Sequence, residues 1–283
     1  ATLNIAALRR RLPMEAPYCR IVASVADIDL ARAAGKIAVT FDIEGMNALH
    51  GRIDLVQHYY ELGVRHMLFA YNRNNLAGSG CHDEDSGLTD FGRRAIDEMN
   101  RVGMIVDMSH SGERSTLDAI EISQRPIVIS HANPLSFHQA KRNKSDRVLR
   151  ALGESGGLLG FSLYPFHLKN GPDCTLEDFC DMVARTADMM GIDQIGIGTD
   201  LCQEQPLSVL EWMRNGRWSK SMDYGEGSKS NADWPRPLSW FRDSRDFPNL
   251  TNGLLARGFS SDDVAKIMGL NWLNFLDAGL KPQ

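Results

Sequence analysis

Short apolar runs rich in Val, Ile, Leu and Gly recur along the chain and predict strands that are buried on both faces. These runs cover residues 37–43, 64–70, 104–108, 127–130, 157–163 and 195–199. Apolar residues spaced three and four positions apart predict helices over residues 54–62, 89–102, 115–124 and 175–190. Shorter helical stretches, 5–12 and 25–36, precede the first run. Strands and helices alternate, which indicates βαβ crossovers and a parallel sheet.

Two forms of parallel sheet compete, the open doubly wound sheet and the closed eight-stranded barrel. The glycine-rich phosphate fingerprint of the first form follows none of the six runs. Instead, residues that can bind metals stand at strand ends: Glu44, His110, His131 and Asp200. In a barrel these ends converge on one mouth, so we predict a single α/β domain over 1–283 with the TIM-type (β/α)8 barrel fold. Six strands are two short of eight, and we expect the first two strands to be missing from this sequence.

Composition narrows the class of partner. The 283 residues carry a net charge of -5, and their 31 Lys and Arg residues are spread along the chain. This distribution argues against a nucleic-acid or membrane surface and favours a small-molecule substrate. We find no apolar run of about 18 residues and no signal-peptide pattern. Five cysteines without a CxxC pair suit a reducing compartment, so we predict a cytoplasmic protein with free thiols.

The strand-end residues suggest metal chemistry. Two imidazoles and a carboxylate in one barrel mouth form a ligand set for a divalent ion such as zinc. A carboxylate can bridge two ions that hold a hydroxide between them, and Asp200 could accept a proton from that water. Taken alone, His110 or His131 could be an ordinary core histidine, and Asp200 could cap a helix. Four such residues at the ends of separate strands favour the metal site.

Six short motifs follow one another between Ser24 and Leu273. They are Ile-Glu-Gly at 43–45, Val-Asp-Met-Ser-His at 106–110, Ser-His at 130–131, Lys-Arg-Asn at 141–143, Ile-Gly-Thr-Asp at 197–200 and Gly-Leu-Asn-Trp-Leu at 269–273. Together they resemble the membrane dipeptidase (renal dipeptidase) family, binuclear zinc peptidases of the amidohydrolase-like barrel superfamily.

The resemblance implies a role for each matched residue. It implies that Glu44 bridges two zinc ions, that His110 and His131 complete one site, and that Asp200 serves the other site as ligand and proton shuttle. Arg142 matches the arginine that binds the substrate carboxylate, and we place Asn143 in the same substrate-binding group. A guanidinium suits this task because it meets a carboxylate with two parallel hydrogen bonds.

Two departures from the family pattern affect the predicted site. The His-x-Asp pair of the family's opening strand is absent here, which coincides with the two strands that we expect to be missing. Tyr71 stands where the family usually has a histidine that contacts the reacting carbonyl. A tyrosine hydroxyl can still donate a hydrogen bond to a developing oxyanion, so we assign Tyr71 a catalytic and substrate-binding role.

These observations predict a zinc-dependent dipeptidase that uses a metal-bound hydroxide, and the resemblance suggests tolerance of a C-terminal D-residue. Two alternatives stay open: another metal-dependent amidase or lactonase on the same barrel, and a metal-poor relative that binds peptides without hydrolysis. The aromatic segment 211–246 could form a lid or the contact of a homodimer, or pack as an ordinary loop.

Overall fold

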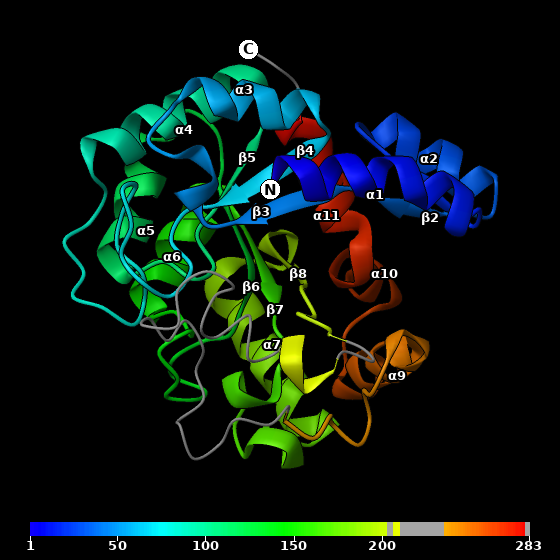
Figure 1. Cartoon of the computed structure of the whole chain (residues 1–283). Helices are drawn as coiled ribbons and strands as arrows, with labels where there is room; N and C mark the ends of the chain where they lie inside the picture. Colours follow the sequence, from blue (N-terminus) through cyan, green and yellow to red (C-terminus); the bar gives the residue numbers. More distant parts are fainter. Residues whose placement is uncertain (203–205, 210–234, 281–283) are drawn as a thin grey trace. The chain divides into compact units, whose positions relative to one another are not determined.

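A computed structural model describes residues 1–202, 206–209 and 235–280 as a chain of alternating strands and helices (Figure 1). The strands are β1 Cys19–Ile21, β2 Ile37–Val39, β3 Phe41–Glu44, β4 Val64–Leu68, β5 Ile105–Asp107, β6 Val128–Ala132, β7 Leu158–Phe161 and β8 Ile195–Ile197. The helices are α1 Thr2–Glu15, α2 Val25–Ala33, α3 Asp54–Glu61, α4 Asp90–Val102, α5 Glu113–Ile122, α6 Asp146–Glu154, α7 Leu176–Met190, α9 Phe247–Arg257, α10 Ser261–Ala265 and α11 Asn271–Gly279.

The main sheet has the strand order β3-β4-β5-β6-β7-β8, so each strand lies beside the next one in the sequence. The pairs β3–β4, β4–β5, β5–β6 and β7–β8 are parallel. A doubly wound sheet reverses its strand order at a switch point, whereas a barrel continues in one direction. The order therefore confirms the predicted α/β fold of the TIM type.

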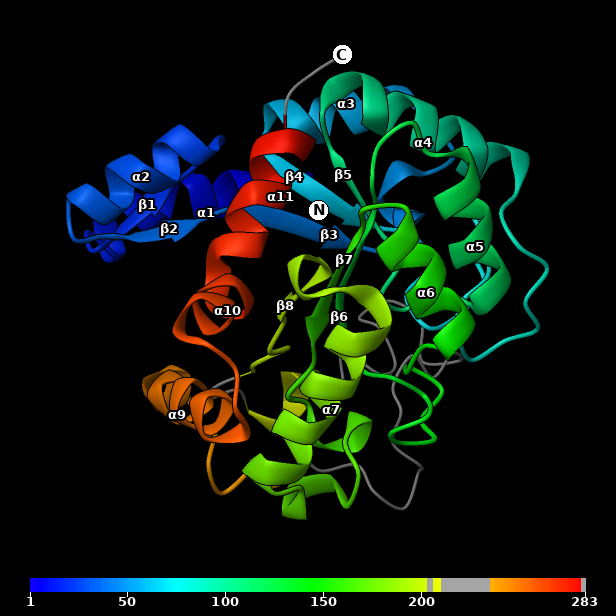
Figure 2. The same ribbon diagram turned by 180° about the vertical axis from the view of Figure 1, so that it is seen from behind.

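The chain divides into two compact units, residues 1–128 with 272–283 and residues 129–271, and β6 begins in the first and continues in the second. In the first unit, β1 and β2 form a separate two-stranded parallel sheet beside α1 and α2 (Figure 2). Helices α3 and α4 pack on each other and against β4 and β5. In the second unit, α7 packs against α6, β8 and α9.

The first predicted strand, 37–43, is two strands in the structure. Residues 37–39 pair with β1, whereas β3 pairs with β4 and shifts register between Phe41 and Asp42. In β3, Phe41 and Ile43 are buried and Asp42 and Glu44 are exposed. The prediction of one strand buried on both faces was therefore wrong here, because a continuous apolar run hides a change of partner at Thr40.

The other predicted strands and the four long helices are confirmed, with ends shifted by a few residues. Thr89 caps α4 by accepting a hydrogen bond from the Gly92 amide, and Thr175 caps α7 by accepting one from the Asp178 amide. Strand β1 and helices α6, α9, α10 and α11 were not predicted.

Two glycines allow close packing in the second unit. A Cβ atom at Gly160 on β7 or at Gly198, just after β8, would collide with the carbonyl oxygen of Ser130 on β6. Only glycine permits this approach of backbone to backbone. The tight packing fixes Ser130 directly before His131.

Most of the aromatic segment 211–246 lies outside the described residues, together with the lid and dimer-contact predictions made for it. Its described end packs within the second unit. The Trp240 ring lies 5.4 Å from that of Phe179, and its Nε1 donates to the Cys174 carbonyl over 2.8 Å. Across the described residues, no helix has the length and apolar character needed to cross a membrane.

Candidate active site

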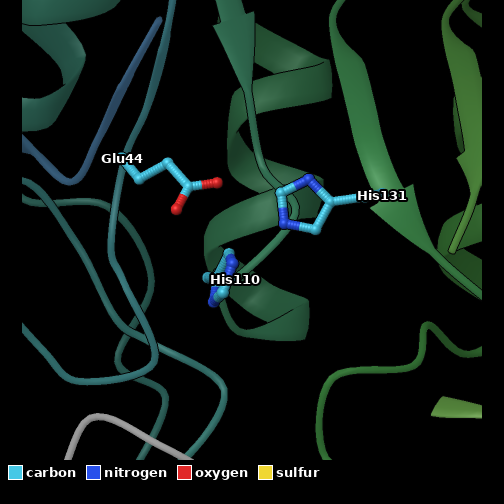
Figure 3. Close-up of side chains that lie close together, drawn as sticks. All are labelled: Glu44, His110 and His131. Carbon is cyan, nitrogen blue, oxygen red and sulfur yellow. The ribbon is translucent and has the colours of Figure 1, made fainter. Parts of the chain in front are cut away.

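Three of the predicted metal ligands come together in the structure. Glu44 ends β3, His110 follows β5 by three residues, and His131 lies within β6. One carboxylate oxygen and one ring nitrogen from each histidine all lie within 4.8 Å of one another (Figure 3). Ligand atoms on a tetrahedral zinc ion are roughly 3.4 Å apart, given bonds of about 2.1 Å, so a small closing movement would let the three atoms bind one ion and leave a fourth position open.

His110 is oriented by a side chain from the loop after β4. Its Nδ1 lies 2.7 Å from the amide oxygen of Asn72, and its ring stacks on Tyr71 with centroids 4.1 Å apart. An amide oxygen only accepts hydrogen bonds, so the proton of the neutral imidazole belongs on Nδ1. The lone pair is therefore on Nε2, the arrangement that a metal-binding histidine needs.

Asn72 was not predicted from the sequence as a functional residue. In the structure it is 2% exposed and has a left-handed backbone with φ of 60°. Its carbonyl accepts a hydrogen bond from the His82 amide over 2.8 Å. A Cβ atom at Gly80 would collide with the Asn72 backbone, so the glycine permits this loop to close. An Asn-rich run directly after an apolar strand, 71–75, is the signal that could have identified it.

His131 is held within its own strand. Its Nδ1 lies 2.8 Å from the Ser130 hydroxyl, and its carbonyl accepts a hydrogen bond from Arg142 Nη2 over 3.2 Å. A hydroxyl can donate or accept, so Ser130 is compatible with either tautomer, unlike Asn72. Both histidines are buried, with 5% and 7% exposure.

Acidic side chains surround His66, which lies on β4 in the first unit. Burial lowers the pKa of His66, but Asp107, Asp42 and Glu44 outweigh this effect and raise the pKa to about 9. The nearest Asp107 oxygen is 3.7 Å from His66 Nδ1, too long for a hydrogen bond, so the attraction is ionic. The other Asp107 oxygen accepts hydrogen bonds from the amide and hydroxyl of Ser109, which stabilises the turn before His110.

Asp200 lies three residues after β8 and is not part of the three-residue ligand group. Its φ of 53° is left-handed, an uncommon conformation for a residue other than glycine. It lines a cavity of about 360 Å³ in the second unit, together with Leu163, Leu238, Phe241 and Arg242. Its roles as second-ion ligand and proton shuttle stay predictions.

The substrate-binding roles of Arg142, Asn143 and Tyr71 also stay predictions. Arg142 is 1% exposed and donates to the His131 carbonyl. Asn143 is 6% exposed, and its side-chain amide group makes three hydrogen bonds within the protein. Tyr71 is half-buried against His110.

Comparison with known proteins identifies related peptidases. The model of the membrane dipeptidase family (peptidase family M19) matches residues 1–212. The dipeptidase tcpJ of Claviceps purpurea is 29% identical over 247 residues, which cover 86% of this chain and 51% of that protein. The dipeptidase aclJ of Aspergillus oryzae is 28% identical over 260 residues, which cover 89% and 54%. The chain thus spans about half the length of these curated relatives.

Solved structures share the fold. An amidohydrolase from Pseudomonas aeruginosa is 32% identical, with a TM-score of 0.92 over 99% of this chain and 84% of that chain. A metallo peptidase from Rhodobacter sphaeroides, crystallised with a phosphinate mimic of the dipeptide L-Ala-D-Ala, is 22% identical. Its TM-score is 0.79 over 98% of this chain and 73% of that chain, a likeness that shows the fold alone.

Proposed function

The chain belongs to the membrane dipeptidase family, peptidase family M19, and we propose on that premise that it is a metal-dependent dipeptidase. The observation that carries the proposal is the cluster of Glu44, His110 and His131, whose ligand atoms lie within 4.8 Å of one another. Carboxylate oxygen and imidazole nitrogen are ligands that zinc takes in hydrolases.

The donor set fits zinc. Asn72 holds His110 in the tautomer that a metal ligand requires, and burial of both histidines limits competition from water. A bound zinc ion would supply a Lewis acid that polarises the peptide carbonyl and activates water. In our proposal of two ions, Glu44 and Asp200 would hold the second ion, and Asp200 would also accept a proton from the attacking water.

Arg142 would bind the C-terminal carboxylate of the dipeptide. Its guanidinium is almost fully buried, and attraction between opposite charges is stronger there than in water. Tyr71, stacked on His110, would donate its hydroxyl to the carbonyl oxygen on which negative charge develops. We extend the substrate range to a C-terminal D-residue, with support from the ligand of the Rhodobacter sphaeroides peptidase.

Tyr71 itself favours a second candidate function. Its neutral hydroxyl replaces a histidine of the family pattern, so the site would suit another amide or a lactone on the same metal centre. A relative that binds peptides without hydrolysis is the remaining alternative. The small-peptide partner belongs to the proposed function, and a cytoplasmic location and a homodimer stay predictions.

A substrate panel tests the proposal. The protein is stripped with a chelator, reloaded with zinc, and assayed on L-Ala-L-Ala, L-Ala-D-Ala, the amide of L-Ala-D-Ala and a lactone. We expect zinc-dependent cleavage of the dipeptides; cleavage of the lactone alone would favour the second candidate, and no turnover would favour the non-hydrolytic alternative.

Arg142→Met tests the carboxylate contact. It should lower kcat/KM for L-Ala-D-Ala by about 100-fold and that for its amide by less than about 3-fold, because only the first substrate loses an ionic contact. Arg150→Met, on the exposed face of α6, is the matched control. Equal losses on both substrates would show that Arg142 is structural.

A further inference from the structure

Two buried asparagines frame the segment that carries Arg142. Asn133 is 0% exposed and lies two residues after His131; Asn143 is 6% exposed and directly follows Arg142. The backbone amide of Asn133 donates to Oδ1 of Asn143 over 3.2 Å. The Asn143 side chain thus ties the end of β6 to the far end of the loop at 134–143.

The Asn133 side chain ties the same point to the neighbouring strand. Its Oδ1 accepts from the amide of Ser162 over 3.1 Å, and its Nδ2 donates to the carbonyl of Ser162 over 3.0 Å. In these two bonds the Asn133 side chain takes the place of a backbone partner, so the pairing of β6 with β7 continues past the end of both strands. A third bond, from Nδ2 to the carbonyl of His167 over 3.2 Å, reaches the turn beyond β7.

The Asn143 side chain reaches the same turn. Its Nδ2 donates to the carbonyl of His167 over 3.0 Å and to the carbonyl of His138 over 2.8 Å. The backbone closes the base of the loop as well, since the amide of Lys144 donates to the carbonyl of Asn133 over 2.9 Å. Both ends of the loop, and one point within it, are therefore fixed.

The chemistry of the network suits a buried cation that must bind an external anion. Every partner of the two amides is a neutral backbone group. An aspartate at either position would bring a negative charge next to Arg142 and compete with a substrate carboxylate. An amide supplies both donors and an acceptor without that charge.

We infer that Asn133 and Asn143 are positioning residues that hold Arg142 at a fixed distance from the metal ligand His131. The hydrogen bond from Arg142 to the His131 carbonyl connects the two sites directly. The network thereby sets the spacing between the scissile carbonyl and the C-terminal carboxylate to one residue, and so selects dipeptides over longer peptides. The inference rests on the proposed function and adds the residues that determine substrate length.

The test compares substrates in the zinc-loaded protein. Asn143→Ala should lower kcat/KM for L-Ala-D-Ala by about 10- to 100-fold, and should change that for the amide of L-Ala-D-Ala and the zinc Kd by less than about 3-fold. The preference for L-Ala-L-Ala over L-Ala-L-Ala-L-Ala should shrink as well. Asn249→Ala removes a comparable hydrogen bond, to the Trp240 carbonyl, and should change none of these ratios.

A double-mutant cycle shows whether Asn143 acts through Arg142. In the Arg142→Met background, Asn143→Ala should have less than about a 3-fold further effect on L-Ala-D-Ala turnover. Should Asn143→Ala fail to fold, Asn143→Ser, which keeps a hydroxyl donor and acceptor, takes its place with the same expected pattern.

The outcomes separate the two proposals. An active wild-type protein whose variant loses the same factor on all substrates, or whose losses add to those of Arg142→Met, overturns the positioning role alone. A wild-type protein without dipeptide turnover overturns the proposed function, and the positioning role with it.

Discussion

The strand ends of the first unit hold their functional side chains differently from those of the second unit. At the ends of β4 and β5, one side chain orients another directly, as Asn72 orients His110. At the ends of β6 and β7, side-chain amides bind backbone groups and fix a loop, which in turn carries Arg142. A metal ligand needs one well-oriented atom, whereas a substrate-binding arginine needs a placed segment.

The two regions also differ in charge. Asp42, Glu44 and Asp107 surround His66 in the first unit, an acidic environment that favours a cation. Around Arg142 in the second unit, the side-chain amides of Asn133 and Asn143 bind only neutral backbone groups. The first region is thus suited to the two proposed metal ligands that it carries, Glu44 and His110. The second carries the third proposed ligand, His131, and the arginine proposed to bind the substrate carboxylate.

The largest expected effect is the loss of zinc and of turnover when His110 is replaced, a loss of zinc that replacement of Arg142 should not cause. His110→Ala should lower dipeptide turnover by at least about 1000-fold and weaken zinc binding, because it removes a ligand from the metal. Arg142→Met should retain zinc at wild-type stoichiometry. Metal analysis of both purified variants checks this, with His50→Asn as the control because His50 is exposed and has the left-handed backbone that Asn tolerates. Loss of zinc from both variants would contradict the claim that His110 binds the metal and Arg142 does not.

A smaller effect should distinguish the two ways of orienting a histidine. Asn72→Gly, which the left-handed backbone at this position tolerates, should weaken zinc affinity by about 10- to 100-fold, since the His110 tautomer and ring orientation depend on the Asn72 amide. Ser130→Ala should weaken it by only about 3-fold, because tight backbone packing still holds His131. Competition titration with a chelating dye measures both values. Equal changes would contradict the difference between the units.

The smallest effect concerns pH. The pKa of His66 is raised in the folded protein to about 9 from its ordinary value of 6.5, so the stabilising charge is fully present below pH 6.5 and lost as pH rises through 9. Burial raises the pKa of Cys174 to about 12 and that of Cys180 to about 11, so these second-unit thiols stay neutral over this range.

In urea unfolding of the metal-free protein, the free energy of unfolding should therefore fall by an amount on the order of 2–3 kcal/mol between pH 6 and pH 9.5. His66→Gln should remove most of this dependence of the free energy of unfolding on pH. If the pH dependence is the same in the variant, the group that titrates is not His66.

The sequence predicted that Glu44, His110 and His131 lie close together, because strand ends in a parallel fold converge and only the strand positions had to be correct. It did not predict Asn72, which lies 38 residues from His110, or the network of Asn133, which joins residues 10, 29 and 34 positions away. Such hydrogen bonds between groups far apart in the sequence leave no periodic pattern in it. The break at Thr40 was missed for the opposite reason, because the apolar pattern continues across it.

The most direct test is a crystal of the zinc-loaded protein measured on both sides of the zinc absorption edge. We predict an anomalous peak about 2.0–2.2 Å from a carboxylate oxygen of Glu44 and from Nε2 of His110 and His131. A fully loaded crystal whose zinc peaks lie away from these three side chains would contradict the metal centre.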